Sequence, residues 1–250
     1  MKLLAGPFLG EFGWELFCWQ GRLRRLSKQY DETCVFCKKG HEILYKDFAK
    51  INKIPSSHTL NCDHAEDIDV IPGNFRLTFY SPFWSDKELN DSGFLDQDFC
   101  KYNKIKSPTE YDIIFHARSR QDIKKQNNWS LANWNAVNTR FTSLGLKTAC
   151  IGLTDRAHEI SNCDNLMNIP LFQLVEYLSS AKLIVGTSSG PLHLASLCGC
   201  PQVVLTGNLN IVRYKNHWNA FNTKVSIVPG GWLPSVNDVI KYTLELLKQI

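Results

Sequence analysis

Short apolar runs alternate with amphipathic stretches in both halves of this chain. In the first half, apolar runs occupy residues 2–8 (KLLAGPF), 33–37 (TCVFC) and 68–73 (IDVIPG), and amphipathic stretches occupy residues 14–29 and 41–50. Brief apolar runs bounded by turn residues predict buried strands, whereas apolar residues spaced three or four apart predict helices. This half is therefore expected to alternate strands with helices.

The pattern lapses between residues 74 and 108, which are rich in aromatic residues, Asp and Asn. We expect loops with short helices there, forming the passage between the two halves. A second alternation predicts, in chain order, a strand at 111–118, a helix at 130–144, a strand at 147–153, a helix at 171–180, strands at 183–185 and 202–205 joined by a short helix, a strand at 224–228 and a closing helix at 235–249. Ser130 and Ser235 are the expected N-caps of their helices.

Strands that alternate with helices are typical of parallel sheets with helical covers. We therefore expect an α/β fold of two Rossmann-like parallel-sheet domains, residues 1–105 and 106–250, facing each other across a cleft. A return of the closing helix onto the N-terminal domain is left open.

The composition is that of an ordinary soluble protein. Hydrophobic residues make up 44% of the 250 positions, and no uninterrupted apolar stretch approaches the roughly 18 to 20 residues that cross a bilayer. Glycine, proline and glutamate interrupt the amino-terminal segment. We interpret it as a cytoplasmic strand and loop rather than a signal peptide.

Nine cysteines are present, an odd number that lies mostly in apolar runs and indicates reduced thiols. Cys34, Cys37, Cys62 and His64 form a set of zinc-competent ligands. Against a zinc site, the run 33–37 has the character of a core strand whose alternate residues face opposite sides. Zinc binding is left open.

A net charge of +4 does not by itself indicate a nucleic-acid-binding protein. Its distribution is more informative, because basic residues crowd one amphipathic helix (Arg22, Arg24, Arg25 and Lys28) and one loop (Arg118, Arg120, Lys124 and Lys125). The helix cluster is compatible with a solvated face. The loop cluster is the better ligand candidate, because it directly follows a predicted strand.

Residues 182–207 (KLIVGTSSGPLHLASLCGCPQVVLTG) carry the most specific signal. They predict a buried strand, a turn of small residues at 186–190, a short helix with His193 and a second buried strand. A small-residue turn at the carboxyl end of a parallel strand is where open α/β sheets bind ligands, and the exposed NH groups of the following helix suit a phosphate. The segment therefore indicates a nucleotide or nucleotide-sugar site.

The same segment resembles the nucleotide-sugar domain of GT-B glycosyltransferases, most closely the ADP-heptose:lipopolysaccharide heptosyltransferase family. That family has a strand ending in Gly-x-Asp-Thr-Gly, then a His, Leu-Ala, and a helix ending at Gly-x-Pro. Here Gly186-Thr187-Ser188-Ser189-Gly190, His193-Leu194-Ala195 and Gly199-Cys200-Pro201 follow that spacing, within a resemblance of roughly 110 residues. The family's acidic residue falls on Ser188, so the transferred sugar can differ.

The resemblance implies a metal-independent, inverting glycosyltransferase with a nucleotide-diphosphate sugar as co-substrate and no bound cofactor. The second half contains no Asp-x-Asp motif, so cations and helix NH groups are expected to stabilise the leaving diphosphate. The expected donor-binding residues are Arg118, Arg120, Lys125, Thr154, Asp155, Ser188, Ser189, Gly190 and His193. Thr154 and Asp155 follow a strand, where a ribose would lie, although helix capping by Asp155 is an equal alternative.

The first half is expected to supply the acceptor side. Glu11 stands where the family carries its catalytic Asp, and it is the expected base that deprotonates the acceptor hydroxyl. Glu15 is the second candidate, and a first-turn helical acid is the alternative interpretation of both. Gly10, Phe12 and Trp14 are expected beside them, the aromatic rings stacking on a sugar or base.

Two other functions stay open at the level of sequence. A small basic transferase could glycosylate a hydroxymethylated base in phage DNA, with the basic helix on the phosphates. Alternatively, the loss of the family's acid at Ser188 could mark a degenerate protein that binds a nucleotide sugar without turnover. The sequence leaves the sugar, nucleobase, acceptor and oligomeric state undetermined.

Overall fold

The chain divides into two compact units, Met1–Cys100 and Lys101–Ile250. The computed structural model describes residues 2–6, 8, 11–53, 75–77, 97–103, 107–121 and 125–250. Each unit contains its own parallel sheet, which confirms the expected α/β class. Among the described residues, no helix is both long and apolar enough to cross a membrane.

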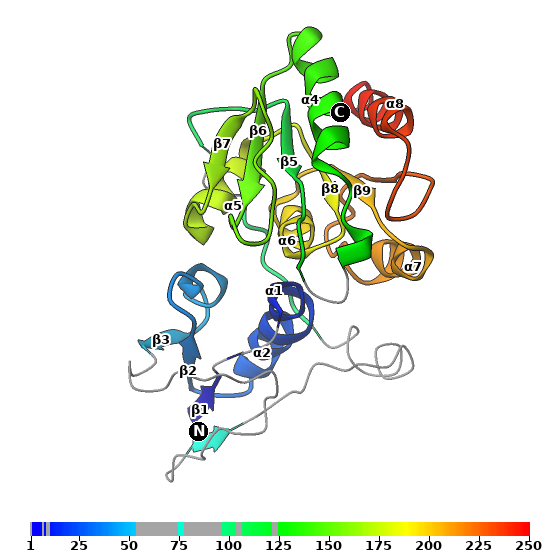
Figure 1. Cartoon of the computed structure of the whole chain (residues 1–250). Coiled ribbons are helices and arrows are strands. Elements are labelled where there is room, and N and C mark those ends of the chain that lie inside the picture. Colours follow the sequence, from blue (N-terminus) through cyan, green and yellow to red (C-terminus); the bar gives the residue numbers. More distant parts are fainter. Residues whose placement is uncertain are drawn as a thin grey trace. The chain divides into compact units, whose positions relative to one another are not determined.

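The second unit is built on a six-stranded sheet whose order is β10-β9-β8-β5-β6-β7 (Figure 1). The strands are β5 (Ile113–His116), β6 (Thr148–Gly152), β7 (Asp164–Met167), β8 (Leu183–Thr187), β9 (Gln202–Leu205) and β10 (Val225–Ile227). All neighbouring pairs are parallel. The central strands β5, β8 and β9 are buried along their whole length, as expected for strands covered on both faces.

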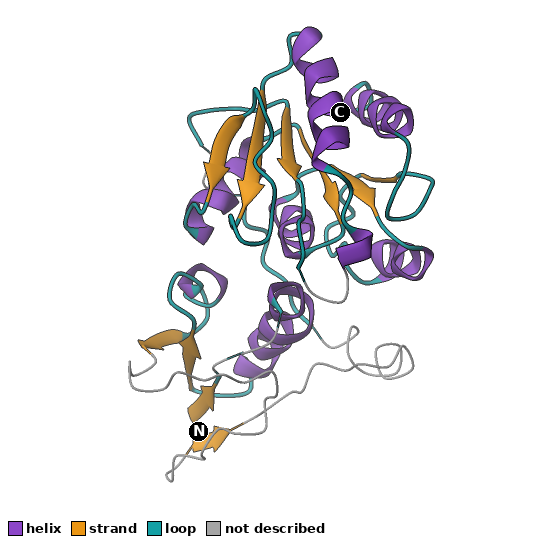
Figure 2. Ribbon diagram, viewed as in Figure 1, coloured by secondary structure: helices purple, strands orange, loops and turns teal. Residues whose placement is uncertain are grey.

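Helices cover both faces of this sheet (Figure 2). They are α4 (Leu131–Ser143), α5 (Leu171–Ser180), α6 (Gly190–Cys198), α7 (Asn208–Asn216) and α8 (Val236–Leu247), with a short 3-10 helix, η4 (Lys125–Asn127). α4 packs against α8, and α5 packs against α6. α8 also contacts β9 and β10, so the closing helix belongs to the core of the second unit.

The core between α4, α8 and the sheet is aromatic and aliphatic. Trp129 and Trp134 meet edge to face at 4.8 Å between ring centroids, and Phe115 stacks on Phe141 at 6.2 Å. The side-chain hydroxyls of Ser130 and Ser235 accept hydrogen bonds from the NH groups of Asn133 and Asp238. Both expected N-caps are therefore confirmed.

The first unit has a smaller parallel sheet of order β3-β2-β1-β4. Its strands are β1 (Lys2–Ala5), β2 (Glu32–Cys37), β3 (Lys50–Lys53) and β4 (Phe75–Leu77). Between β1 and β2, residues 12–27 are helical, as α1 (Phe12–Trp14), a π-helical segment η1 (Glu15–Trp19) and α2 (Gln20–Ser27). A 3-10 turn, η2 (Glu42–Leu44), precedes β3.

Gly6 directly follows β1 with φ of +88°, a conformation that glycine adopts without strain. A Cβ atom at this position would overlap the backbone oxygen of Phe36 in the neighbouring strand. We therefore expect Gly6→Ala to destabilise the first unit by about 2 kcal/mol or more, from left-handed backbone strain and the clash together. Chemical denaturation would measure the loss, and Gly40→Ala, also at positive φ but with open space around it, separates the strain from the clash.

Several elements differ from the sequence-based expectation. The helix expected at 41–50 is wrong, because the chain forms η2 and then β3. β4 lies within the stretch expected to be irregular, and β7 and α7 were not expected at all. β7 is a partly exposed edge strand of sequence DNLM, so it lacks the apolar run by which strands are recognised. The strand expected at 68–73 lies outside the described residues.

Candidate functional site

The strand order of the second unit places a topological switch point between β5 and β8. The chain runs from β5 outward to β6 and β7 on one side, then returns to the other side of β5 as β8, β9 and β10. In parallel α/β sheets, ligands bind in the crevice at the carboxyl ends of the strands that flank this reversal. The loops after His116 and after Thr187 therefore form the candidate site.

The turn between β8 and α6 is held in a fixed conformation. The NH of Ser188 donates to the carbonyl of Leu205 at 3.0 Å, and its hydroxyl accepts from the hydroxyl of Tyr214 at 3.1 Å. Gly186 is required beneath the turn, because a Cβ there would lie 2.8 Å from the Leu192 side chain and 3.0 Å from the carbonyl oxygen of His116.

Helix α6 begins at Gly190, with Ser189 as its N-cap residue. The first-turn NH groups of a helix have no partner inside the helix, and the helix dipole favours an anion beside them. Pro191 contributes no NH, so Gly190 and Leu192 supply the first-turn donors. The expected small-residue turn therefore leads directly into an anion-compatible helix end.

His116 at the end of β5 is hydrogen bonded to this turn. The hydroxyl of Ser189 donates to the carbonyl of Thr187 at 2.8 Å and lies 2.9 Å from Nδ1 of His116. Because a hydroxyl has one proton and a carbonyl only accepts, Nδ1 of His116 carries the proton in this pair. Burial, together with the nearby Arg118 charge, lowers the pKa of His116 to about 3, so the imidazole is neutral.

Arg118 connects three loops at the carboxyl edge of the sheet. Its side chain is buried, and its guanidinium donates to the carbonyl oxygens of Ser188 at 3.0 Å and Asn127 at 3.3 Å. The guanidinium also lies 4.9 Å from the ring centroid of Trp232, within cation–π range. Arg118 thus places a fixed positive charge beside the β8–α6 turn.

Contacts with Asn128 and Ala157 hold the loop that begins at Arg118. The backbone NH and carbonyl of Arg120 bond the side-chain amide of Asn128 at 3.0 and 2.7 Å, and Arg118 forms an antiparallel bridge with Ala157. The side chain of Arg120 is half-buried and that of Lys125, at the start of η4, is exposed. Lys124 lies outside the described residues. These contacts bring Arg118, Arg120, Ser188 and Ser189 to one edge of the sheet.

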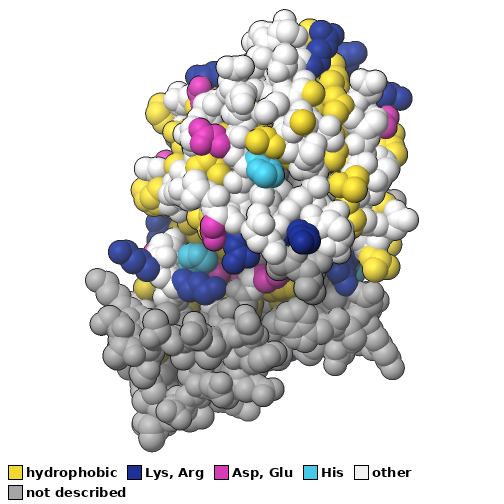
Figure 3. Space-filling view, in the orientation of Figure 1, with side chains coloured by type: hydrophobic (Ala, Val, Ile, Leu, Met, Phe, Trp, Pro, Cys, Tyr) yellow, Lys and Arg dark blue, Asp and Glu magenta, His cyan; other side chains and the backbone are white. Residues whose placement is uncertain are grey.

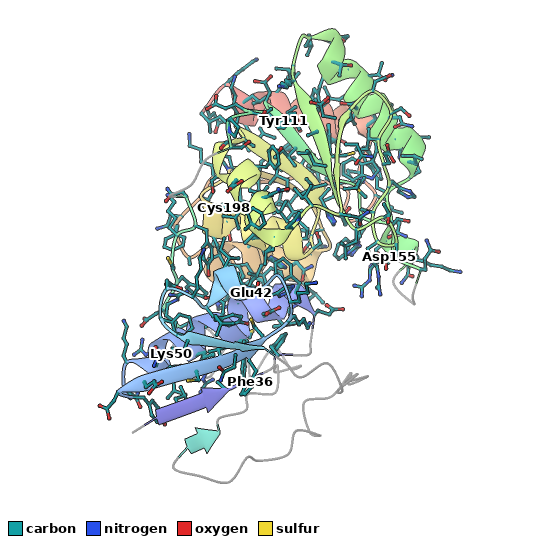
Figure 4. The ribbon with its side chains drawn as sticks, turned by 90° about the vertical axis from the view of Figure 1, so that its left-hand side faces the viewer. Phe36, Glu42, Lys50, Tyr111, Asp155 and Cys198 are labelled. Atoms are coloured by element: carbon teal, nitrogen blue, oxygen red, sulfur yellow. The ribbon has the colours of Figure 1, made fainter. Side chains whose placement is uncertain are left out.

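Thr154 and Asp155 lie in the exposed loop after β6, where Figure 4 labels Asp155. The NH of Thr154 donates to the side-chain oxygen of Asn168 at 3.1 Å, and Asp155 pairs with the adjacent Arg156 at 3.3 Å. No helix begins here, since the chain turns and joins the bridge at Ala157. Helix capping by Asp155 is therefore wrong.

His193 lies inside a cluster of aromatic rings. Its ring centroid is 4.4 Å from Trp218 and 5.7 Å from Tyr214. Burial lowers its pKa to about 3, so it faces this cluster as a neutral imidazole. Tyr214 belongs to α7, which the sequence pattern did not indicate, so this setting was missed together with the helix.

In the first unit, Glu11 is the N-cap residue of α1 and its side chain is exposed. Its carbonyl accepts from the NH groups of Trp14 and Glu15 at 3.0 and 3.1 Å. The side chains of Phe12 and Trp14 are half-buried. Gly10 lies outside the described residues.

Glu15 has a different environment from Glu11. Its side chain is 1% exposed, and its two carboxylate oxygens meet Nδ1 of His41 at 2.8 Å and the hydroxyl of Tyr45 at 2.7 Å. The sequence singled out Glu15 but gave no indication of these two partners. They lie in the segment that was expected to be helical and instead forms η2.

The basic helix is not a uniformly solvated face. Arg24 is buried, pairs with Asp47 and donates to the carbonyl of Leu44 at 3.2 Å. Lys28 pairs with Asp98 at 2.7 Å. On the face drawn in Figure 3, Lys and Arg side chains are interspersed with Asp and Glu over the described residues. Arg24 and Lys28 are thus paired within the protein, whereas a nucleic-acid interface would need such charges to bind phosphates.

The zinc-competent set is only partly described. Cys34 and Cys37 lie on opposite faces of β2, as the alternating burial of that strand shows, and Cys62 and His64 lie outside the described residues. Across the described ranges, no group of three or more His, Cys, Asp or Glu side chains could hold a metal ion.

No protein-family model matches the sequence, and no curated protein matches it. Solved structures do match. The glycosyl transferase family 9 protein from Veillonella parvula superposes with a TM-score of 0.64 at 13% identity, covering 100% of this chain and 98% of that one. The ADP-heptose LPS heptosyltransferase II of E. coli gives a TM-score of 0.56 at 14% identity, with 99% and 98% covered.

A third match is the dodecameric iron-containing heptosyltransferase TibC from enterotoxigenic E. coli, solved with ADP-D-beta-D-heptose. Its TM-score is 0.55 at 16% identity, over 82% of this chain. This chain spans only 58% of the TibC chain. Together these matches confirm, at the level of fold, the resemblance to GT-B heptosyltransferases.

Proposed function

We propose that this protein, which shares its fold with these heptosyltransferases, is a glycosyltransferase that moves a sugar from a nucleoside-diphosphate sugar to an acceptor hydroxyl. The observation that carries the proposal is that Arg118 and the amino terminus of α6 meet at the switch point of the second unit. There the buried guanidinium of Arg118 binds the backbone of the turn that opens α6. A fixed cation beside a helix amino terminus is suited to a diphosphate.

In this proposal the second unit binds the donor. The NH groups of Gly190 and Leu192 and the hydroxyl of Ser188 donate to the diphosphate, while Ser189 holds the turn through its bonds to Thr187 and His116. Arg120 and Lys125 add positive charge from the neighbouring loop, and Thr154 and Asp155 take the ribose. His193 contributes by shaping the wall of the site as a neutral ring rather than as a cation, because its pKa is about 3.

The reaction we propose is a single displacement. The acceptor oxygen attacks the anomeric carbon while the bond to the diphosphate breaks, so the configuration inverts and no covalent intermediate forms. No step passes through a metal. The acceptor is bound by the first unit, where Glu11 is the base expected from the family resemblance. A glycan hydroxyl is the proposed acceptor, since Arg24 of α2 and Lys28 directly after it form ion pairs within the protein.

A panel of ADP-, GDP-, UDP- and dTDP-sugars tests this function, with release of nucleoside diphosphate as the measurement. We expect one nucleotide class to be turned over, slowly with water and faster with an added glycan acceptor. Binding of a nucleoside diphosphate without release from any donor would indicate a degenerate binding protein instead. Neither binding nor release with any member would contradict the proposal.

We also expect the release of nucleoside diphosphate to need no metal ion. Because fixed cations and helix NH groups neutralise the leaving group, incubation with excess EDTA is expected to leave the rate of nucleoside diphosphate release within about twofold of the untreated rate. Loss of turnover in EDTA, restored by adding Mg²⁺ or Mn²⁺, would show that a metal takes part. NMR of the anomeric proton in the first-formed product tests inversion.

A further inference from the structure

A carboxylate and an imidazole form a hydrogen-bonded pair in the first unit that the proposed reaction has not used. Glu15 opens η1 after β1, and His41 follows β2. Both segments leave the carboxyl end of a parallel strand, the edge at which such sheets bind ligands. The Glu15 side chain is 1% exposed and the His41 side chain 23% exposed, so the pair is buried at one end and open to solvent at the other.

The hydrogen bonds determine which nitrogen of His41 carries the proton. One oxygen of Glu15 accepts from the hydroxyl of Tyr45 at 2.7 Å, and the other lies 2.8 Å from Nδ1 of His41. A carboxylate only accepts hydrogen bonds, so Nδ1 carries the proton and Nε2 presents a lone pair. A buried carboxylate that fixes an imidazole in this tautomer is the arrangement of a histidine general base.

The surrounding chain keeps this pair in place. The ring of Phe12 meets the ring of His41 edge to face at 5.5 Å between centroids. Glu15 is the first residue of the π-helical segment, a rare conformation that occurs often at functional sites. Figure 4 labels Glu42, which directly follows His41 in the 3-10 turn. Phe12 of α1 and Glu15 of η1 thus both contact the imidazole, which lies at the start of η2.

We propose that His41, rather than Glu11, is the catalytic base that activates the acceptor, and that Glu15 is the residue that positions it. This inference rests on the proposed glycosyltransferase function. Nε2 of His41 takes the proton of the acceptor hydroxyl, and the oxygen's electron pair forms the bond to the anomeric carbon. The bond from that carbon to the diphosphate oxygen breaks, and its electron pair leaves with the nucleoside diphosphate. His41 afterwards releases its proton to water.

Two substitutions in the full-length protein test the pair by different routes. His41→Ala removes the base, and kcat for nucleoside diphosphate release from the active donor is expected to fall about 100-fold or more, with donor KM unchanged. Glu15→Gln keeps the shape of the side chain, but its amide group donates to Nδ1 of His41 and moves the ring proton to Nε2. Nε2 can then no longer accept a proton from the acceptor, so kcat falls to a similar extent. Glu32→Gln, which breaks the exposed pair with Lys50, is the matched control and is expected to retain kcat within about twofold.

Added imidazole distinguishes a base from a structural support. We expect it to restore turnover to His41→Ala, because a free imidazole can enter the vacated site, and not to Glu15→Gln, where the mis-protonated ring still occupies it. His41→Ala with wild-type kcat, or a loss that imidazole leaves unchanged in a protein that melts like wild type, would overturn the proposal. If His41→Ala fails to fold, Glu15→Gln with wild-type kcat would overturn it alone.

The comparison with Glu11 and with the wild-type protein separates the possible failures. If Glu11→Gln abolishes turnover while both pair variants keep it, Glu11 is the base and this inference fails while the glycosyltransferase function stands. If wild-type protein releases nucleoside diphosphate from no donor, the proposed function itself fails, and the base assignment fails with it.

Discussion

Arg118→Met is expected to reduce nucleoside diphosphate affinity by about 100-fold or more. The proposed hydrogen bonds from the guanidinium to the diphosphate are charge-assisted, and such bonds contribute about 1.5 to 3 kcal/mol each. The substitution removes the bonds to the carbonyls of Ser188 and Asn127 and the positive charge beside the turn. Arg118→Lys retains the charge but lacks the two-pronged geometry. We therefore expect its affinity to lie between those of wild type and Arg118→Met.

Isothermal titration calorimetry with the nucleoside diphosphate of the active donor would measure these affinities. Arg140→Met is the matched control, because Arg140 lies on the exposed last turn of α4 and is expected to leave affinity unchanged. Chemical denaturation should accompany the titration, since two buried carbonyls lose a donor. Wild-type affinity in Arg118→Met would show that the diphosphate binds elsewhere.

Acid is expected to destabilise the second unit through His116 and His193. Burial is the main cause that holds both pKa values at about 3, against an ordinary 6.5. Because the unfolded chain binds these protons first, their contribution is fully present above pH 6.5 and is lost as the pH falls toward 3. At pH 5 the loss is about 2 kcal/mol for each histidine, at 1.36 kcal/mol per pH unit.

Denaturation curves at pH 7 and pH 5 would measure this loss. In His193→Gln, the fall in unfolding free energy between the two pH values is expected to shrink by about 2 kcal/mol, because one titrating group is gone. Phe141→Leu is the control. It loosens the packing on Phe115 and leaves the rings around His193 in place, so it should lower stability at both pH values and keep the pH dependence. An unchanged pH dependence in His193→Gln would show that His193 is not held neutral by the fold.

In the second unit the sequence predicted the turn at 186–190 and the strands beside it better than the surrounding elements. Buried parallel strands leave long apolar runs, so β5, β8 and β9 were recognisable, and the small residues between Gly186 and Gly190 marked the turn. Polar residues make up more than half of α7 and half of β7, and the positions of both elements depend on tertiary packing rather than on local pattern. The setting of His193 was missed for this reason, since Tyr214 lies in α7.

In the first unit, the wrong prediction of a helix at residues 41–50 had a larger consequence. The stretch 41–50 has spacing compatible with a helix, yet it forms a 3-10 helix and turns, and β3 begins only at its last residue, Lys50. A helix would not have suggested that His41 and Tyr45 both contact Glu15. Residue types at separations of 26 and 30 positions carry no sequence signal that would unite them.

The most direct test of the account is hydrogen–deuterium exchange of the full-length protein with and without a saturating nucleoside diphosphate. The central claim is that the second unit holds the diphosphate at the switch point between β5 and β8. The account predicts slower exchange at residues 117–121 and 186–193, with residues 131–143 of α4 unchanged. Protection confined to other segments at a saturating concentration would contradict it.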